Sequence, residues 1–247
     1  MLPVKLFKRD FGGMASVMGA VLLILAAPLA LLGEGVGPTV MAVGLLSAAA
    51  ALLGILTAVE NVMDDREGWI APLIVGLGRV RYAAVRSAVS TAAAVAAVAP
   101  AAALYSLLMP ASAAPVAAAS AASAAVGAAL GLLIGFSAST RGYAYAWGVS
   151  LWTALALIYE LALTFASIYF AVSEPLFAAA LLANPLTAAR LVGIAWADPS
   201  LLTLGPAGTY LYKSLGAYAP LLFPATAAVW YLSLAAASII KAHRRDL

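Results

Sequence analysis

Charged side chains that could bind a partner or do chemistry are few, and they gather in one segment. Residues 60–86 read ENVMDDREGWIAPLIVGLGRVRYAAVR and hold eight of the chain's Asp, Glu, Lys and Arg residues, which number 13 basic and 10 acidic in all. Residues 64–67, DDRE, are predicted to form a solvated polar cluster, and a short apolar run separates them from a basic group. About ten apolar residues are too few to cross a bilayer, so this run is predicted to form a short interfacial helix or an ordinary solvated loop.

The second candidate group is Glu160, which follows Tyr159 inside the apolar run WTALALIYELALTFASIYF. An ionisable group near the bilayer centre costs about 2.5–3.5 kcal/mol on insertion scales, and each large apolar neighbour offsets about 0.3–0.6 kcal/mol. No Lys, Arg or His is expected in another span, so Glu160 is predicted to have no charged partner. Two interpretations stay open: a structural carboxyl that hydrogen-bonds to Tyr, Ser or Thr between helices, or a polar point on a transport route.

Enzyme chemistry finds little support in the remaining residue types. The chain has no cysteine, one histidine, His243, and no Gly-rich phosphate loop that ends in Lys-Ser or Lys-Thr. Thiolates and imidazoles are the ligands that zinc and copper prefer, and a Gly-rich loop is what holds ATP phosphates in P-loop proteins. The sequence therefore predicts a protein with no catalytic residues, no metal site and no cofactor of its own.

Composition indicates the elements that must position these groups. Of 247 residues, 65% are hydrophobic and 9% are charged, against about 25% charged in soluble domains, and the mean hydropathy is +1.05. Apolar stretches near the length of a membrane-spanning helix recur along the chain. The sequence predicts an all-α, multi-pass membrane protein with six spans. The predicted spans are Met14–Leu32, Pro38–Val59, Ala88–Met109, Pro115–Ser137, Ala144–Val172 and Leu221–Ile240.

The distribution of basic residues predicts the orientation. With six spans, eleven Lys and Arg residues fall on one face and only Arg190 and Lys213 on the other. Basic residues concentrate on cytoplasmic loops, so both termini and residues 60–86 are predicted to be cytoplasmic, in a cell membrane. A cleavable signal peptide at the N-terminus is a rival interpretation, although no polar cleavage region follows the first apolar run.

Small residues predict a close contact between helices, and aromatic residues predict where a span meets the membrane surface. Ser123, Gly127, Gly131 and Gly135 recur every fourth position in the fourth span, which allows a close helix contact with a partner subunit or within the chain. Tyr143, Tyr145 and Trp147 begin the fifth span and are typical of an interfacial aromatic belt.

The charged segment resembles the cytoplasmic loop of type-2 ATP-binding-cassette transporter permeases. The likeness consists of an acidic residue, a Glu-Gly pair, an apolar run and Gly78-x-x-Arg81 before the third span, together with the chain end HRRDL. Family members commonly have Pro at the position of Gly78 and Gly-Lys where this chain has Arg86-Ser87. The candidate residues of this loop are Glu60, Asp64, Asp65, Arg66, Glu67, Gly68, Trp69, Gly78 and Arg81.

Two further motifs resemble one subgroup, the NosY-like permeases of the nitrous oxide reductase maturation system. Asn184-Pro185 followed by Arg190-Leu191 is similar to an external segment of that subgroup, and so is the aromatic-acidic pair Tyr159-Glu160. The chain differs in having Thr187-Ala188 where the subgroup tends to carry an acidic residue.

The resemblance implies a mechanism and partners. Residues 1–247 would form a single transmembrane domain, usually a homodimer, on a separate cytoplasmic ATPase that holds ATP and magnesium. Residues 1–13 would be an interfacial elbow helix, residues 60–87 a coupling helix, and residues 173–220 an external re-entrant segment that caps the dimer. An extracytoplasmic accessory protein and membrane lipid are further expected partners, and nucleic acid is not.

Three alternatives stay open at this point. A permease of the same family could export a drug, a lipid or a peptide. An ATP-independent channel or secondary transporter could use Glu160. A membrane scaffold would transport nothing.

Overall fold

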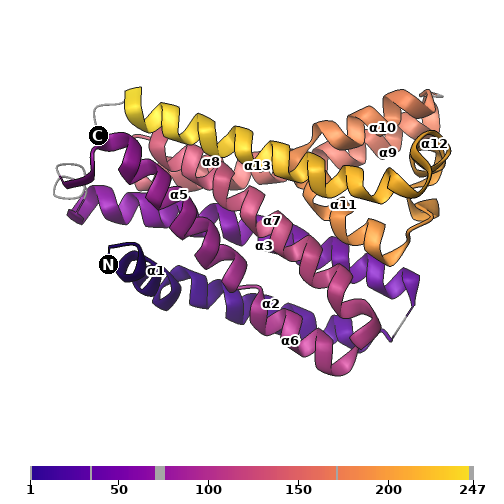
Figure 1. Cartoon of the computed structure of the whole chain (residues 1–247), viewed down its shortest axis with the longest axis horizontal. Coiled ribbons are helices and arrows are strands. Elements are labelled where there is room, and N and C mark those ends of the chain that lie inside the picture. The colour runs from indigo at the N-terminus through magenta and orange to yellow at the C-terminus, as the bar shows by residue number, and fades with distance from the viewer. Residues whose placement is uncertain (1, 34, 70–75, 171, 245–247) are drawn as a thin grey trace.

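A computed structural model describes residues 2–33, 35–69, 76–170 and 172–244, which fold into helices without any strand (Figure 1). This confirms the predicted all-α class. The α-helices are α1 (Leu2–Gly12), α2 (Met14–Ala30), α3 (Val36–Asp64), α5 (Arg79–Ala96), α6 (Ala99–Leu108), α7 (Pro110–Ser137), α8 (Arg141–Thr153), α9 (Tyr159–Tyr169), α10 (Glu174–Ala183), α11 (Pro185–Ala197), α12 (Gly205–Leu215) and α13 (Ala219–Arg244). Two π-helices, η1 (Asp65–Trp69) and η2 (Ala154–Ile158), and two 3-10 helices, η3 (Leu202–Leu204) and η4 (Gly216–Tyr218), lie between them.

Several of these helices are long and apolar enough to cross a membrane. Five such helices occur among the described residues, and up to 7 if each of two bent pairs is counted as one span. The bent pairs are α1 with α2, which is bent by 46°, and α10 with α11, which is bent by 108°. Each of the six spans predicted from the sequence overlaps one of these helices. The chain is therefore compatible with a multi-pass membrane protein.

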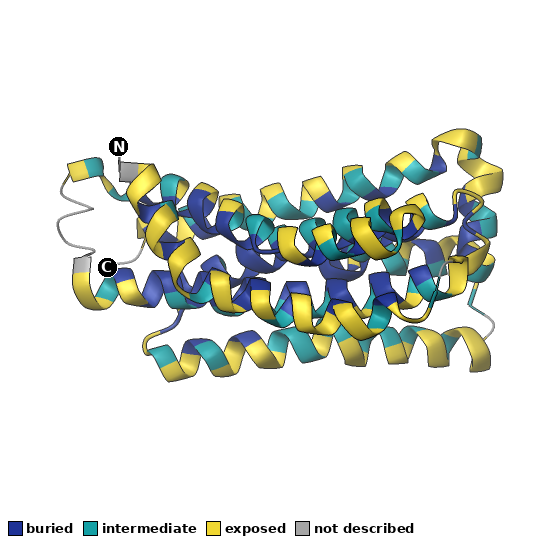
Figure 2. Ribbon diagram, turned by 90° about the horizontal axis from the view of Figure 1, so that it is seen from below, coloured by how far each residue is buried: buried dark blue, intermediate teal, exposed yellow. Residues whose placement is uncertain are grey.

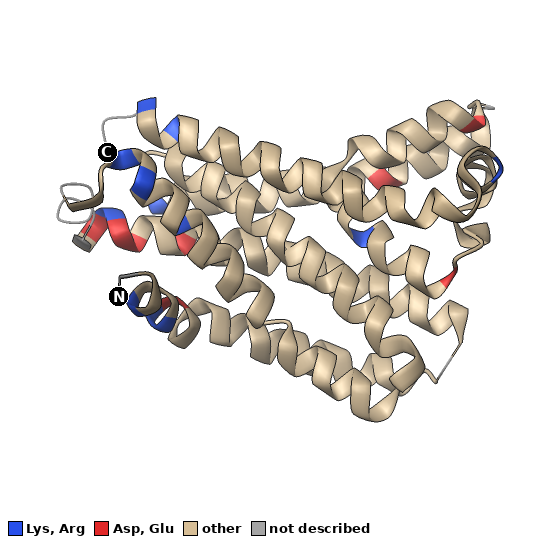
Figure 3. Ribbon diagram, viewed as in Figure 1, with Lys and Arg blue, Asp and Glu red and all other residues tan. Residues whose placement is uncertain are grey.

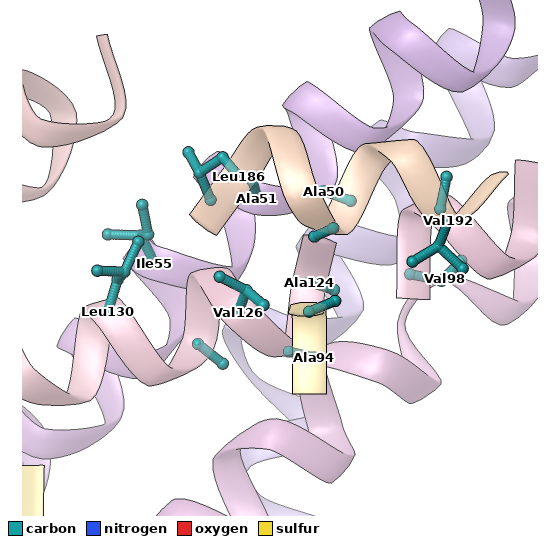
Figure 4. Close-up of a cluster of buried hydrophobic side chains, with 14 of the residues drawn as sticks. Ala50, Ala51, Ile55, Ala94, Val98, Ala124, Val126, Leu130, Leu186 and Val192 are labelled. Atoms are coloured by element: carbon teal, nitrogen blue, oxygen red, sulfur yellow. The ribbon is translucent and has the colours of Figure 1, made fainter. Parts of the chain in front are cut away.

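Helix α7 packs against α3, α5, α6, α11 and α13 (Figure 1). Figure 2 shows that the buried residues gather between the helices. The glycines of α7 allow the close contact with α3: a Cβ atom built on Gly127 would lie 2.3 Å from the Ala51 carbonyl oxygen, and one on Gly131 would lie 2.3 Å from that of Ile55. Figure 4 shows Ala51 and Ile55 among buried apolar side chains such as Leu130. The small-residue seam thus contacts a helix of its own chain.

We expect the Gly127→Ala variant to be less stable than the wild type. The added methyl group must push α7 away from the α3 backbone, and overpacking of this kind costs about 1–3 kcal/mol. Gly44→Ala is the matched control, because a Cβ on Gly44 meets nothing within 4 Å. Thermal midpoints from fluorescence-detected size-exclusion chromatography should fall for Gly127→Ala only. Equal midpoints for the two variants would show that the seam is not closely packed.

Most of the charged residues lie at one end of the bundle (Figure 3). We define the charged end as the one that holds α1, η1, the start of α5, the start of α8 and the last turns of α13 (Figures 1 and 3). The opposite end holds α12 and the turns next to it. Both described ends of the chain lie at the charged end (Figure 1).

The predicted external segment is helical and lies toward the opposite end. Prolines stand in the first turn of α10, α11 and α12, where a missing N–H group costs no hydrogen bond. After α11, the Asp198 carboxylate accepts hydrogen bonds from the backbone N–H groups of Ser200, at 3.1 Å, and Thr203, at 2.8 Å. Burial would raise the pKa of Asp198, but the hydrogen bonds from Ser200 and Thr203 outweigh it and lower this pKa. A charged Asp198 therefore stabilises this turn.

Candidate functional sites

The acidic residues of the charged segment lie on one continuous helical stretch, because α3 runs directly into η1. Glu60, Asp64 and Glu67 are spaced four and three residues apart and share one face of the helix. Asp65 lies on another face, four residues after Asn61. The helix thus presents acidic groups in two directions.

The first group surrounds Arg141 at the start of α8. The Arg141 guanidinium donates to Glu60 Oε1 at 2.6 Å, to Asp64 Oδ1 at 2.7 Å and to Glu67 Oε2 at 2.8 Å. Tyr145, one turn further along α8, donates its hydroxyl to the other carboxylate oxygen of Glu60. We refer to Arg141, Glu60, Asp64 and Glu67 as the Arg141 cluster. It is partly exposed and ties the end of α3 to α8.

The second group is buried and centres on Arg86 of α5, whose side chain is 0% exposed. Arg86 Nη1 donates to Asp10 Oδ2 at 2.6 Å, and Arg86 Nε lies 3.0 Å from Asp65 Oδ2. Arg86 Nη2 donates to the Asn61 carbonyl oxygen at 2.6 Å. Arg9 adds contacts to Asp65 Oδ1 at 2.7 Å and to Asp10 Oδ1 at 3.2 Å.

We refer to Arg9, Asp10, Asp65 and Arg86 as the buried ion cluster, in which two positive charges balance two negative ones. Tyr82 OH donates to Asp65 Oδ2 at 2.8 Å and completes the shell around that carboxylate. Burial raises the pKa of Asp10, and the neighbouring Arg86 and Arg9 lower it by a smaller amount. Asp10, Asp65 and Arg86 have fully buried side chains, whereas that of Arg9 is 39% exposed. Buried charges are tolerated only when paired, so the cluster joins α1, η1 and α5 as one unit.

The predicted coupling residues outside the Arg141 cluster have different surroundings. The expectation that Asp64 to Glu67 form a solvated group is wrong for Asp65, which is fully buried because Arg86, Arg9 and Tyr82 surround it. Arg66 donates to the Ala138 carbonyl oxygen at 2.7 Å, before α8. Gly68 and Arg81 are exposed. The side chain of Trp69 and residues 70–75, the predicted apolar helix, lie outside the described residues.

The backbone conformation explains why this chain has Gly78 where the resemblance led us to expect proline. It precedes the first turn of α5 with φ at 75°, in the region that favours glycine. Proline is restricted to a φ near −65° and could not take this conformation. The backbone at the start of α5 therefore requires glycine.

Glu160 has a charged partner, so the prediction that it has none is wrong. Glu160 Oε2 accepts a hydrogen bond from Arg190 Nη1 at 2.6 Å, and Glu160 Oε1 accepts one from Thr187 Oγ1 at 3.1 Å. Both partners lie on α11, in the segment that we expected to be outside the membrane. The sequence pattern failed here because α11 turns back against α7, which brings Arg190 to the depth of Glu160.

Asn184 explains why α11 is held at this place. Its side-chain oxygen accepts from the N–H groups of Leu186 and Thr187, at 2.9 and 3.4 Å, and so caps the N-terminus of α11. Its Nδ2 donates to the Leu155 carbonyl oxygen at 2.6 Å. Leu155 lies in the π-helix η2, where the helical hydrogen bonding is irregular. One side chain therefore links the corner between α10 and α11 to the helix that carries Glu160.

Two aromatic side chains satisfy the C-terminal carbonyl groups of α10. Tyr159 OH donates to the Ala180 carbonyl oxygen at 2.8 Å, and Trp230 Nε1 donates to that of Leu182 at 2.9 Å. Pro185, which directly follows the capping residue, is the first residue of α11. Tyr159, Asn184 and Pro185 are thus structural elements of a sharp corner, which accounts for three of the residues singled out from the sequence.

A small cavity of about 20 Å³ adjoins the Glu160–Arg190 pair, with Ser47 and Ser123 on its walls. Arg190 Nε and Ser123 Oγ are buried and have no hydrogen-bond partner among the described residues. A polar cavity of this volume is large enough for one water molecule. The cavity can therefore hold one water molecule beside the pair.

The sequence interpretation missed Arg9, Asp10, Arg86 and Arg141 as site residues. A signal for Arg141 was present, because three acidic residues on one helix face require a basic partner when that face packs. No comparable signal identified Asp10 or Arg86, which are 76 residues apart. Their pairing depends on how α1 and α5 lie against α3.

No protein-family model matches the chain, and no curated protein sequence matches it significantly.

Proposed function

We propose that the chain is the membrane-spanning permease subunit of an ATP-binding-cassette transporter. It would cross the cell membrane six times with both termini in the cytoplasm, form a homodimer and bind a separate cytoplasmic ATPase that holds ATP and magnesium. Its own residues would do no catalysis. The motif at Asn184-Pro185 favours a role in nitrous oxide reductase maturation, with an extracytoplasmic protein as a further partner.

One observation supports this proposal most strongly. The charged stretch from α3 through η1 is connected by ion pairs to three other helices, α1, α5 and α8. A force applied between η1 and α5 would therefore reach several helices together. A solvated loop without such contacts would absorb the force, and an ATPase could not move the bundle through it.

The residues available for ATPase contact are those left exposed around residues 70–75. Gly68 and Arg81 are exposed, and Glu67 keeps 63% of its side chain accessible. Asp65 is unsuitable as a contact because it is buried. A test of coupling should therefore change Arg81 and leave Asp65 intact.

We expect the Arg81→Glu variant to lose most of the stimulation of the partner ATPase. The substitution reverses a charge at the exposed start of α5 and breaks no ion pair among the described residues. Lys213→Glu is the matched control, since Lys213 is also exposed but lies on α12. Both variants should be purified from native membranes, with mass spectrometry of bound proteins and an ATPase assay after reconstitution.

The outcomes separate the proposal from its alternatives. Recovery of an ATPase with wild type and Lys213→Glu, and loss of ATPase stimulation with Arg81→Glu, would support it. Absence of any ATPase, with transport by the purified chain that Glu160→Gln abolishes, would indicate an ATP-independent transporter. The ion pair of Glu160 with Arg190 argues against the latter, because the carboxylate already has a structural partner.

A further inference from the structure

An open groove runs across α7 at the charged end of the bundle. One part lies between α7 and α13 and has a volume of about 560 Å³, and the other lies between α7 and α8 and has a volume of about 470 Å³. The two parts share Leu133, Ser137 and Lys241 and are therefore continuous. Each is in the range of ligand sites, about 300–1,000 Å³. We refer to the whole as the α7 groove.

The walls of the α7 groove are mainly apolar, and its mouth is basic. Lys241 and Arg244, in the last turn of α13, line it, are exposed, and form no ion pair with any described residue. Figure 3 shows this basic end of α13 at the charged end. The acidic residues of the Arg141 cluster already have a partner in Arg141. Among the described residues, the two positive charges at the groove therefore have no acidic partner.

Aromatic side chains lie on the α8 side of the groove. Tyr143 and Trp147 line it, with ring centroids 6.0 Å apart, and both are more than half exposed. Amphipathic aromatic rings favour the level of lipid headgroups. The site thus combines an apolar trough, an interfacial aromatic pair and two cationic groups at one end.

We propose that the α7 groove binds one anionic phospholipid, with its acyl chains along Leu133 and its phosphate between Lys241 and Arg244. Charge complementarity favours an anionic headgroup over a zwitterionic one, and basic pockets between membrane helices are known to bind such headgroups. The hydroxyl of Ser137, between the two parts of the groove, can donate to the phosphate. This proposal depends on the chain lying in a membrane and is independent of any ATPase.

The test compares retention of two lipids by native mass spectrometry. The wild-type protein in detergent receives phosphatidylglycerol or phosphatidylcholine. We expect one phosphatidylglycerol to be retained in preference, and the Lys241→Gln/Arg244→Gln variant to bind it roughly tenfold or more weakly. Lys5→Gln/Lys8→Gln is the matched control, because it removes the same charge from exposed positions of α1. It should change binding by less than about twofold.

A second measurement locates the lipid. Brominated phosphatidylglycerol should quench tryptophan fluorescence in the wild type more than in Trp147→Phe, whereas brominated phosphatidylcholine should show a smaller difference.

Equal retention of phosphatidylglycerol by the two double variants would overturn the proposal. The chain has no cysteine, so Ser137→Cys would be its only one. Efficient disulfide cross-linking between copies, unaffected by phosphatidylglycerol, would show that a second copy occupies the groove and would also overturn the proposal.

Discussion

Replacing Arg86 with methionine is expected to lower the stability of the bundle by about 3–5 kcal/mol, the usual cost of breaking a buried ion pair. Methionine fills much of the same volume but leaves Asp10 and Asp65 with only Arg9 as a charged partner. The Asn61 carbonyl oxygen also loses its contact with Arg86 Nη2. A net negative charge would then remain buried between α1, η1 and α5.

Thermal midpoints of the purified protein in detergent would measure this effect. Arg81→Met is the matched control, because Arg81 lies on the same helix and is exposed. The double variant Arg86→Met/Asp10→Asn removes one charge of each sign, so it should recover part of the lost stability. If Arg86→Met and Arg81→Met had equal midpoints, the cluster would not hold α1 against α5.

The second large effect is expected at Glu160 and Arg190. Either single substitution to glutamine leaves the other charge without its partner within an apolar bundle. Because both side chains are about a quarter exposed, the expected cost of each is about 1–3 kcal/mol, below that of a fully buried pair. The double variant Glu160→Gln/Arg190→Gln has no unpaired charge and should cost less than the two single changes together.

A double-mutant cycle, measured by chemical unfolding in mixed micelles, gives the coupling energy of this pair. Glu174→Gln provides a control for the loss of a carboxylate, because Glu174 is exposed at the start of α10 and forms no ion pair with a described residue. Additive costs of the two single substitutions would show that the pair makes no net contribution. The double variant also separates structure from transport, because it should fold yet lack both charges on any route past Glu160.

The glycine seam shows how local sequence and tertiary packing relate. Gly127 and Gly131 recur at the spacing of one helix face, so a close contact was predictable from the sequence. The partner helix was not, because the same pattern fits a contact with another subunit. Only the packing of α7 on the backbone at Ala51 and Ile55 decided it.

The sequence by itself determined the properties that depend on residues close together in the chain. Long apolar runs determined the helical class, and the acidic residues from Glu60 to Glu67 determined where the chain would carry charge. The tertiary structure decided which charges meet, since Arg86 pairs with Asp10 and Glu160 with Arg190 across 76 and 30 residues. These pairings depend on how each helix is rotated and on the 108° corner between α10 and α11, which no local pattern specifies.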